Sequence, residues 1–129
     1  MQYALKKSLF ALLTTLSCAA WANATLHCVG TAPTWSLTLG KHWTLTLPTQ
    51  TLQLTPVPAQ YAAGMPKTFL TAYQTHTGKQ SVTIVIQEAP DGCTDGESDN
   101  VYTHRVTVLW RNIAFIGCCH SVAHMGTTR

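Results

Sequence analysis

The carboxylates of this 129-residue chain gather in one short stretch. All five lie between positions 88 and 99, as Glu88, Asp91, Asp95, Glu97 and Asp99. Such a stretch can supply oxygen ligands to Ca²⁺ or present an acidic surface to a basic protein. It can also be a solvated hairpin turn, in which Asp and Gly are common. The spacing is not that of the EF-hand calcium loop. We expect protein contacts at Asp91, Asp95, Glu97 and Asp99, and keep Asp95 and Asp99 as weaker calcium candidates.

Two histidines near the C-terminus have a spacing that suits a transition metal. His120 and His124 would share one face of a helical turn, where imidazoles could hold Zn or Cu. The rest of the tail has no helix pattern, so an irregular tail is the other interpretation. His104 is expected on the inward face of a strand, as a partly buried side chain. No firm metal site or cofactor is predicted.

Catalysis has no support in the residue pattern. No serine lies in a nucleophile-elbow context, and every carboxylate belongs to one local segment. Glycoside hydrolysis would need two carboxylates from separate elements, and a cysteine nucleophile would need a free thiol. We therefore expect a binding protein and not an enzyme.

The N-terminal 24 residues have the pattern of a signal peptide. A basic start is followed by an apolar segment and a small-x-small cleavage site: Lys6 and Lys7, Ser8–Ala20, and Ala22–Ala24. The apolar segment is too short to span a bilayer. A lipoprotein anchored at Cys18 is disfavoured, because Thr15 stands where a large aliphatic residue is expected. The sequence predicts a periplasmic or secreted single domain over 25–129.

Cleavage changes the charge and the cysteine count. Losing Lys6 and Lys7 from eight basic residues leaves six against five acids, a net charge of +1. This gives no basic excess for a nucleic-acid backbone. Four cysteines remain, at positions 28, 93, 118 and 119, which is the parity of two disulfides. Cys118 and Cys119 point to opposite faces of a strand and do not suit each other. Two pairings stay open, and we favour Cys93 with Cys118 and Cys28 with Cys119.

Apolar and polar residues alternate along most of the remaining chain, which is the pattern of half-buried strands. The expected inward residues are Trp35, Leu37, Leu39, Trp43, Leu45, Leu47, Leu52, Leu54, Val82, Ile84, Ile86, Tyr102, His104, Val106, Val108 and Trp110. Pro90–Gly92 is expected to break a strand, Arg111–Asn112 to reverse the chain, and 56–66 to be an irregular loop that contributes Tyr61 and Met65 to a partner surface. We predict an all-β domain of seven or eight antiparallel strands, as a small barrel or a sandwich.

Three stretches resemble a family of small exported bacterial proteins and lipoproteins. Gly30–Leu37 (GTAPTWSL) is similar to its Gly-Thr-Glu-Pro-Phe-Trp-Ser-Leu stretch, and Cys93–Tyr102 to its Cys-Ser-Asp-Gly-Met-Ser-Asp-Arg-Tyr stretch. The closing IGCC resembles its Arg-Gly-Cys ending. Ala32 replaces the family's acid and Thr34 its aromatic residue. The family has no settled activity, so the resemblance implies an exported domain and no chemistry.

A looser likeness of architecture and location connects the chain with periplasmic lysozyme inhibitors and barrel-shaped immunity proteins. Together with the acidic stretch, it favours an inhibitor or immunity-type protein that binds a cell-wall (peptidoglycan) hydrolase. The alternative is a periplasmic module that binds Ca, Zn or Cu.

Overall fold

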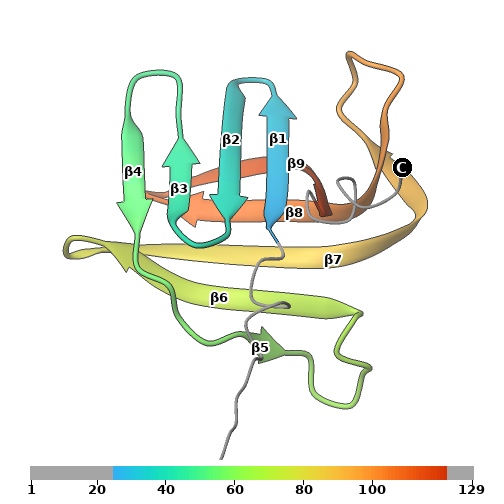
Figure 1. The fold of residues 1–129 in the computed structure, drawn as a ribbon, viewed down its shortest axis with the longest axis horizontal. Coiled ribbons are helices and arrows are strands. Elements are labelled where there is room, and N and C mark those ends of the chain that lie inside the picture. The colour runs from blue at the N-terminus through green and yellow to red at the C-terminus, as the bar shows by residue number, and fades with distance from the viewer. Residues whose placement is uncertain (1–24, 122–129) are drawn as a thin grey trace, which may run out of the picture.

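The computed structural model describes residues 25–121, which form a single curled antiparallel sheet (Figure 1). Its nine strands are β1 (Leu26–Thr31), β2 (Thr34–Leu39), β3 (Trp43–Thr46), β4 (Thr51–Leu54), β5 (Gln60–Tyr61), β6 (Leu70–Thr77), β7 (Gln80–Thr94), β8 (Val101–Trp110) and β9 (Ile113–Ser121). The sheet order is β4-β3-β2-β1-β9-β8-β7-β6-β5. The sheet therefore consists of two meanders, β1–β4 and β5–β9, which are joined where β1 pairs with β9. The predicted all-β class is confirmed.

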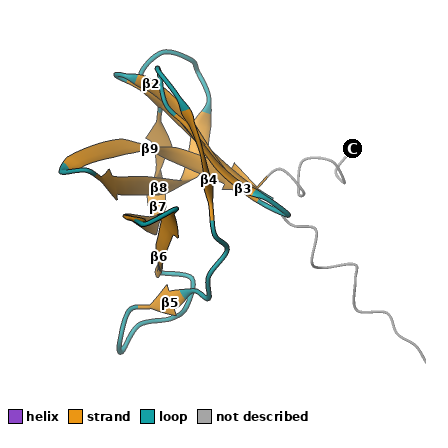
Figure 2. Ribbon diagram, turned by 90° about the vertical axis from the view of Figure 1, so that its left-hand side faces the viewer, coloured by secondary structure: helices purple, strands orange, loops and turns teal. Residues whose placement is uncertain are grey.

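The curl makes a half-barrel in which β1–β4 lie across β6–β8 (Figures 1 and 2). The chain after β4 meets β6, where the Thr55 amide donates to the His76 carbonyl at 3.1 Å. The Thr75 hydroxyl, which is buried, donates to the Thr55 carbonyl. These bonds bring the two arms of the sheet together over one core.

The core follows the alternation read from the sequence. Trp35, Leu37 and Leu45 from one arm and Val82, Ile84, Val106 and Val108 from the other are among its buried residues. Leu52 lies at its margin, packed against it while partly exposed. Removing this apolar surface from water is the main stabilising term for such a sheet. The predicted reversal at Arg111–Asn112 is also confirmed, as a tight hairpin turn in which both residues have positive φ angles, 54° and 65°.

Both favoured disulfides are present. Cys28 is bonded to Cys119 and Cys93 to Cys118. Cys119 belongs to the main core, whereas Cys118 lies in a second, small cluster with Ala89, Cys93 and Tyr102. The side chains of the adjacent Cys118 and Cys119 thus lie on opposite faces of β9. Two disulfides indicate an oxidising environment outside the cytoplasm.

Three predictions about the strands are wrong in detail. The strand count is nine, because the 56–66 connection contains the short strand β5. Pro90–Gly92 does not end its strand: β7 continues to Thr94 through a register shift between Glu88 and Cys93. Such a bulge leaves residues unpaired, which accommodates a proline without an N–H and Gly92 at a φ of 87°. Tyr102 packs in the second cluster and not with Val106 in the main core.

Residues 25–121 contain no helix long and apolar enough to cross a membrane. The predicted signal peptide, Cys18 and His124 lie outside the described residues.

Candidate functional site

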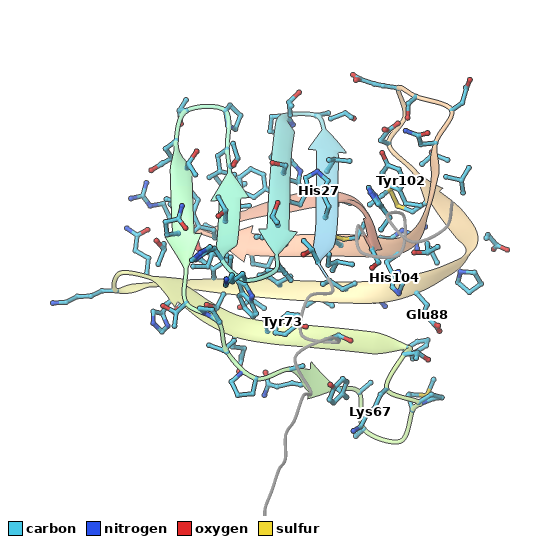
Figure 3. The ribbon with its side chains drawn as sticks, in the orientation of Figure 1. His27, Lys67, Tyr73, Glu88, Tyr102 and His104 are labelled. Carbon is cyan, nitrogen blue, oxygen red and sulfur yellow. A yellow bond between two sulfur atoms is a disulfide. The ribbon has the colours of Figure 1, made fainter. Side chains whose placement is uncertain are left out.

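Three features of the sequence lie along the end of the sheet where β7 joins β8, with the β7–β8 turn and the β5–β6 loop on opposite sides of it (Figure 1). The first is the acidic turn, residues 95–100, which connects these two strands. The second is the bulge groove, where β7 shifts register beside the start of β8. The third is the apolar loop, residues 61–69, which leads from β5 into β6. In Figure 3, Tyr102, His104 and Glu88 follow one another down this end of the sheet, with Lys67 below them.

Asp95 organises the acidic turn through its own carboxylate. Its Oδ1 accepts hydrogen bonds from the amides of Glu97 at 2.9 Å and Ser98 at 2.8 Å. The hydroxyls of Ser98 and Tyr102 donate to Oδ2, at 2.8 and 3.4 Å. The Ser98 and Glu97 amides are the main causes that lower the pKa of Asp95 from 3.8 to about 2. The turn is therefore fixed by a carboxylate that stays ionised and whose oxygens are occupied within the turn.

The base of the turn is anchored to the rest of the domain. The Thr31 hydroxyl, at the end of β1, donates to the Asp95 carbonyl at 2.8 Å. The Cys93–Cys118 disulfide ties the end of β7 to β9. Gly96 has a φ of 82°, a conformation that side chains disfavour. The projecting turn is thus held at a defined position.

The remaining carboxylates are displayed to solvent. Glu88, Asp91, Glu97 and Asp99 are all exposed. None of them forms an ion pair with a basic residue in the part of the chain that the structure describes. The negative charges of these four side chains are therefore not paired by direct contacts within residues 25–121, while Arg105 lines a groove together with Asp95.

The bulge groove has a volume of about 610 Å³ and lies beside the acidic turn. Glu88 on β7 is directly opposite His104 on β8, and Asp91 lines the same groove. The hydroxyl of Thr103 and Nδ1 of His104 are 2.8 Å apart, so one ring nitrogen is engaged locally. The groove offers a partner two carboxylates and an imidazole, all partly or fully exposed.

The apolar loop reaches the same surface through Glu88. The Glu88 amide donates to the Phe69 carbonyl at 3.2 Å, which ties the end of the loop to the first residue of the bulge. Tyr61, Met65 and Phe69 are 47%, 46% and 38% exposed. Lys67 lies 5.2 Å from the centre of the Tyr61 ring, the distance of a cation–π contact. Phe69, at the end of the apolar loop, therefore lies next to Glu88.

The stretches that carry the family resemblance also converge at the acidic turn. A second groove, of about 370 Å³, is lined by Gly30–Ala32, Cys93–Asp95 and Gly117–Cys118. Gly117 is required for the close approach of β9 to β1, because a Cβ there would lie 2.1 Å from the Val29 carbonyl oxygen. Residues from each of the three stretches thus lie together at the base of the acidic turn.

A separate group of aromatic side chains lies where β1 meets β9. The His120 ring is 5.9 Å from the His27 ring and 5.3 Å from the Tyr102 ring, between centroids. Figure 3 labels His27 on β1 and Tyr102 on β8. The predicted partner of His120, His124, is outside the described residues, within which no group of three or more His, Cys, Asp or Glu side chains is placed to hold a metal ion.

Two of these contacts between side chains were not predicted from the sequence. Glu88 and His104 face each other only because the bulge sets the register of β7 against β8. His27 meets His120 only because the two ends of the described chain pair as β1 and β9. Neither contact has a local pattern in the sequence, although Pro90–Gly92 within a strand could have indicated a bulge.

The chain matches no protein-family model, no curated protein sequence and no solved structure. The resemblance of its three short stretches therefore stays an expectation from the sequence.

Proposed function

We propose that this protein acts by binding a basic protein through the end of the sheet formed by the acidic turn, the bulge groove and the apolar loop. The observation that carries the proposal is that every carboxylate of the chain lies on or beside one anchored projection, without an internal counter-ion in residues 25–121. Charges arranged in this way steer a partner and set its orientation.

The local rigidity of the turn supports recognition. A loop that is already fixed by hydrogen bonds and a disulfide loses little conformational freedom when it enters a complex. Tyr61 and Met65 offer exposed apolar surface on the other side of this end of the sheet, which a partner large enough to span it can remove from water. Charge would thus contribute to the rate of association, and the apolar loop to the lifetime of the complex.

The most concrete partner is a cell-wall hydrolase, which makes this protein an inhibitor or immunity-type protein of the envelope. The two disulfides support a location where such enzymes act. A projecting acidic turn also suits an enzyme with a basic substrate cleft. In this role the protein would have no catalytic activity of its own.

The proposal is tested with the oxidised protein in lytic assays and in binding kinetics against basic lysozymes and amidases. The double variant Glu97→Gln/Asp99→Asn should lower the association rate roughly tenfold or more at low salt and weaken its salt dependence. Tyr61→Ala/Met65→Ala should mainly raise the dissociation rate.

Two variants at the opposite end of the sheet serve as controls. Leu109→Ala removes an apolar side chain with the same 46% exposure as Met65, and Lys79→Gln removes a charge from the β6–β7 turn. Both should leave binding unchanged. Lysis that proceeds unhindered with every enzyme, together with no measurable binding, would refute the proposal.

A further inference from the structure

Two histidines from strands at opposite ends of the described chain form a cross-strand pair. His27 on β1 is directly opposite His120 on β9 in the antiparallel register. The next pair along is Cys28 with Cys119, which is closed by a disulfide with a Cα–Cα distance of 4.0 Å. The covalent link beside them holds the two backbones together, so the spacing of the imidazoles does not depend on a flexible segment.

The distance between the rings suits two ligands of one metal ion. A metal–nitrogen bond of about 2.1 Å places the ion about 3 Å from the centre of each imidazole, so the centres of two such rings are about 5 to 6 Å apart. The observed separation of the His27 and His120 ring centres is 5.9 Å, with an angle of 72° between the ring planes. The spacing of the two ring centres is therefore compatible with coordination of one ion.

Thr38 gives His27 a hydrogen-bond contact at one ring nitrogen, as is typical of an imidazole that binds a metal through its other nitrogen. Nδ1 of His27 lies 3.2 Å from the Thr38 hydroxyl on β2. A hydrogen bond at one ring nitrogen fixes the tautomer and the orientation of the ring, and leaves the other nitrogen available to a metal. Burial, followed by the proximity of His120, lowers the pKa of His27 below 6.5.

His120 has the complementary feature of a buried nitrogen with no hydrogen-bond partner in the described residues. A buried polar atom without a partner is costly, and a bound ion or water is a common explanation for one. The ring is held between His27 and Tyr102, and a cavity of about 250 Å³ lined by Asn100, Val101, Tyr102 and His120 adjoins it. This cavity borders His120 and leaves room for water molecules on the Tyr102 side of its ring.

We propose that His27 and His120 together bind a late first-row divalent ion, Zn²⁺ or Cu²⁺, with water completing the coordination sphere. Imidazole ligands favour these ions over Ca²⁺ and Mg²⁺. No third His, Cys, Asp or Glu joins the pair in residues 25–121, so this is a two-ligand site. It shares no ligand residue with the acidic turn, although Tyr102 contacts both His120 and Asp95.

The test is titration of the oxidised protein with CuCl₂ and ZnCl₂ in a non-coordinating buffer. Calorimetry should give one ion per chain, and the electron paramagnetic resonance spectrum of the Cu²⁺ form should show coupling to two nitrogens. His27→Ala and His120→Ala should each weaken binding by tenfold or more and leave coupling to one nitrogen. Thr38→Val should weaken binding about tenfold through the positioning of His27, while both nitrogens remain coupled.

Matched histidine variants complete the design. His42→Ala and His76→Ala remove exposed imidazoles in the β2–β3 turn and in β6, and should leave binding unchanged. Loss of the site in His124→Ala, with binding intact in His27→Ala, would overturn the proposal in favour of a His120–His124 pair. No binding of either ion by the wild type would also overturn it.

A measurement on the unaltered protein covers the case in which a variant fails to fold. Zn²⁺ should shift the imidazole nitrogen resonances of His27 and His120 and leave those of His42 and His76 in place. Shifts at other histidines alone would contradict the assignment.

Discussion

Removing the Cys93–Cys118 disulfide tests whether this bond anchors the acidic turn. In the double variant Cys93→Ala/Cys118→Ala the chain loses a crosslink between residues 25 positions apart. The chain-entropy model then gives a loss of about 3.5 kcal/mol in the free energy of unfolding. The same model gives about 4.6 kcal/mol for the Cys28–Cys119 bond, whose residues are 91 positions apart.

The two disulfides differ more in their local than in their global effect. Cys93 lies two residues before Asp95, whereas Cys28 and Cys119 lie in the main core. We expect the Cys93→Ala/Cys118→Ala variant to be the more stable of the two double variants. Its acidic turn, however, should open more often than the acidic turn of Cys28→Ala/Cys119→Ala. Amides of 89–102 should exchange faster with solvent in it than in Cys28→Ala/Cys119→Ala.

Urea unfolding and hydrogen-exchange mass spectrometry provide the two measurements. The midpoint and slope of the urea transition give the free energy of unfolding for each variant. Exchange of peptides that cover the turn reports local opening. An unchanged urea midpoint in Cys93→Ala/Cys118→Ala would show that this crosslink contributes nothing to stability. Equal exchange of the turn in both variants would refute its role as the anchor.

Three further predictions follow from single residues. Because the pKa of Asp95 is lowered from 3.8 to about 2, its stabilising contribution is present above pH 3.8 and is lost as the pH falls through about 2. Asp95→Asn should therefore lower the melting temperature at neutral pH, and the difference should close between these two values in a pH series. Because the pKa of His27 is lowered from 6.5, the unfolded state takes up its proton first, so stability falls below that pH. His27→Gln should remove this part of the acid sensitivity, and an unchanged profile would contradict it. Gly117→Ala should destabilise the domain by about 1–3 kcal/mol in urea unfolding, because the added methyl group would meet the Val29 carbonyl oxygen at 2.1 Å; a variant of wild-type stability would show that β1 and β9 can separate freely.

Local pattern was sufficient to predict the body of the fold. Leu37, Val82 and Val108 are buried because each occupies the inward position of an alternating strand, and such alternation can be read from a few neighbouring residues. The adjacency of Cys118 and Cys119 was equally informative, since strand geometry alone prevents them from bonding to each other.

Contacts that depend on the register between paired strands could not be predicted in the same way. The bulge after Glu88 lets a strand continue through Pro90 and Gly92, which locally favour a break. It also brings His104 opposite Glu88 and allows Tyr102 to reach Asp95. These contacts depend on the register of the sheet, which is a property of the packed domain and not of any one segment.

In the proposed function, the acidic turn recognises a basic partner by its charge. This is tested by the association rate with a basic wall hydrolase over a range of ionic strengths, for the wild type and for Glu97→Gln/Asp99→Asn. We expect the rate for the wild type to fall steeply as salt rises, and the variant to associate more slowly with a weaker salt dependence. Identical rates for the two proteins at every salt concentration would contradict it.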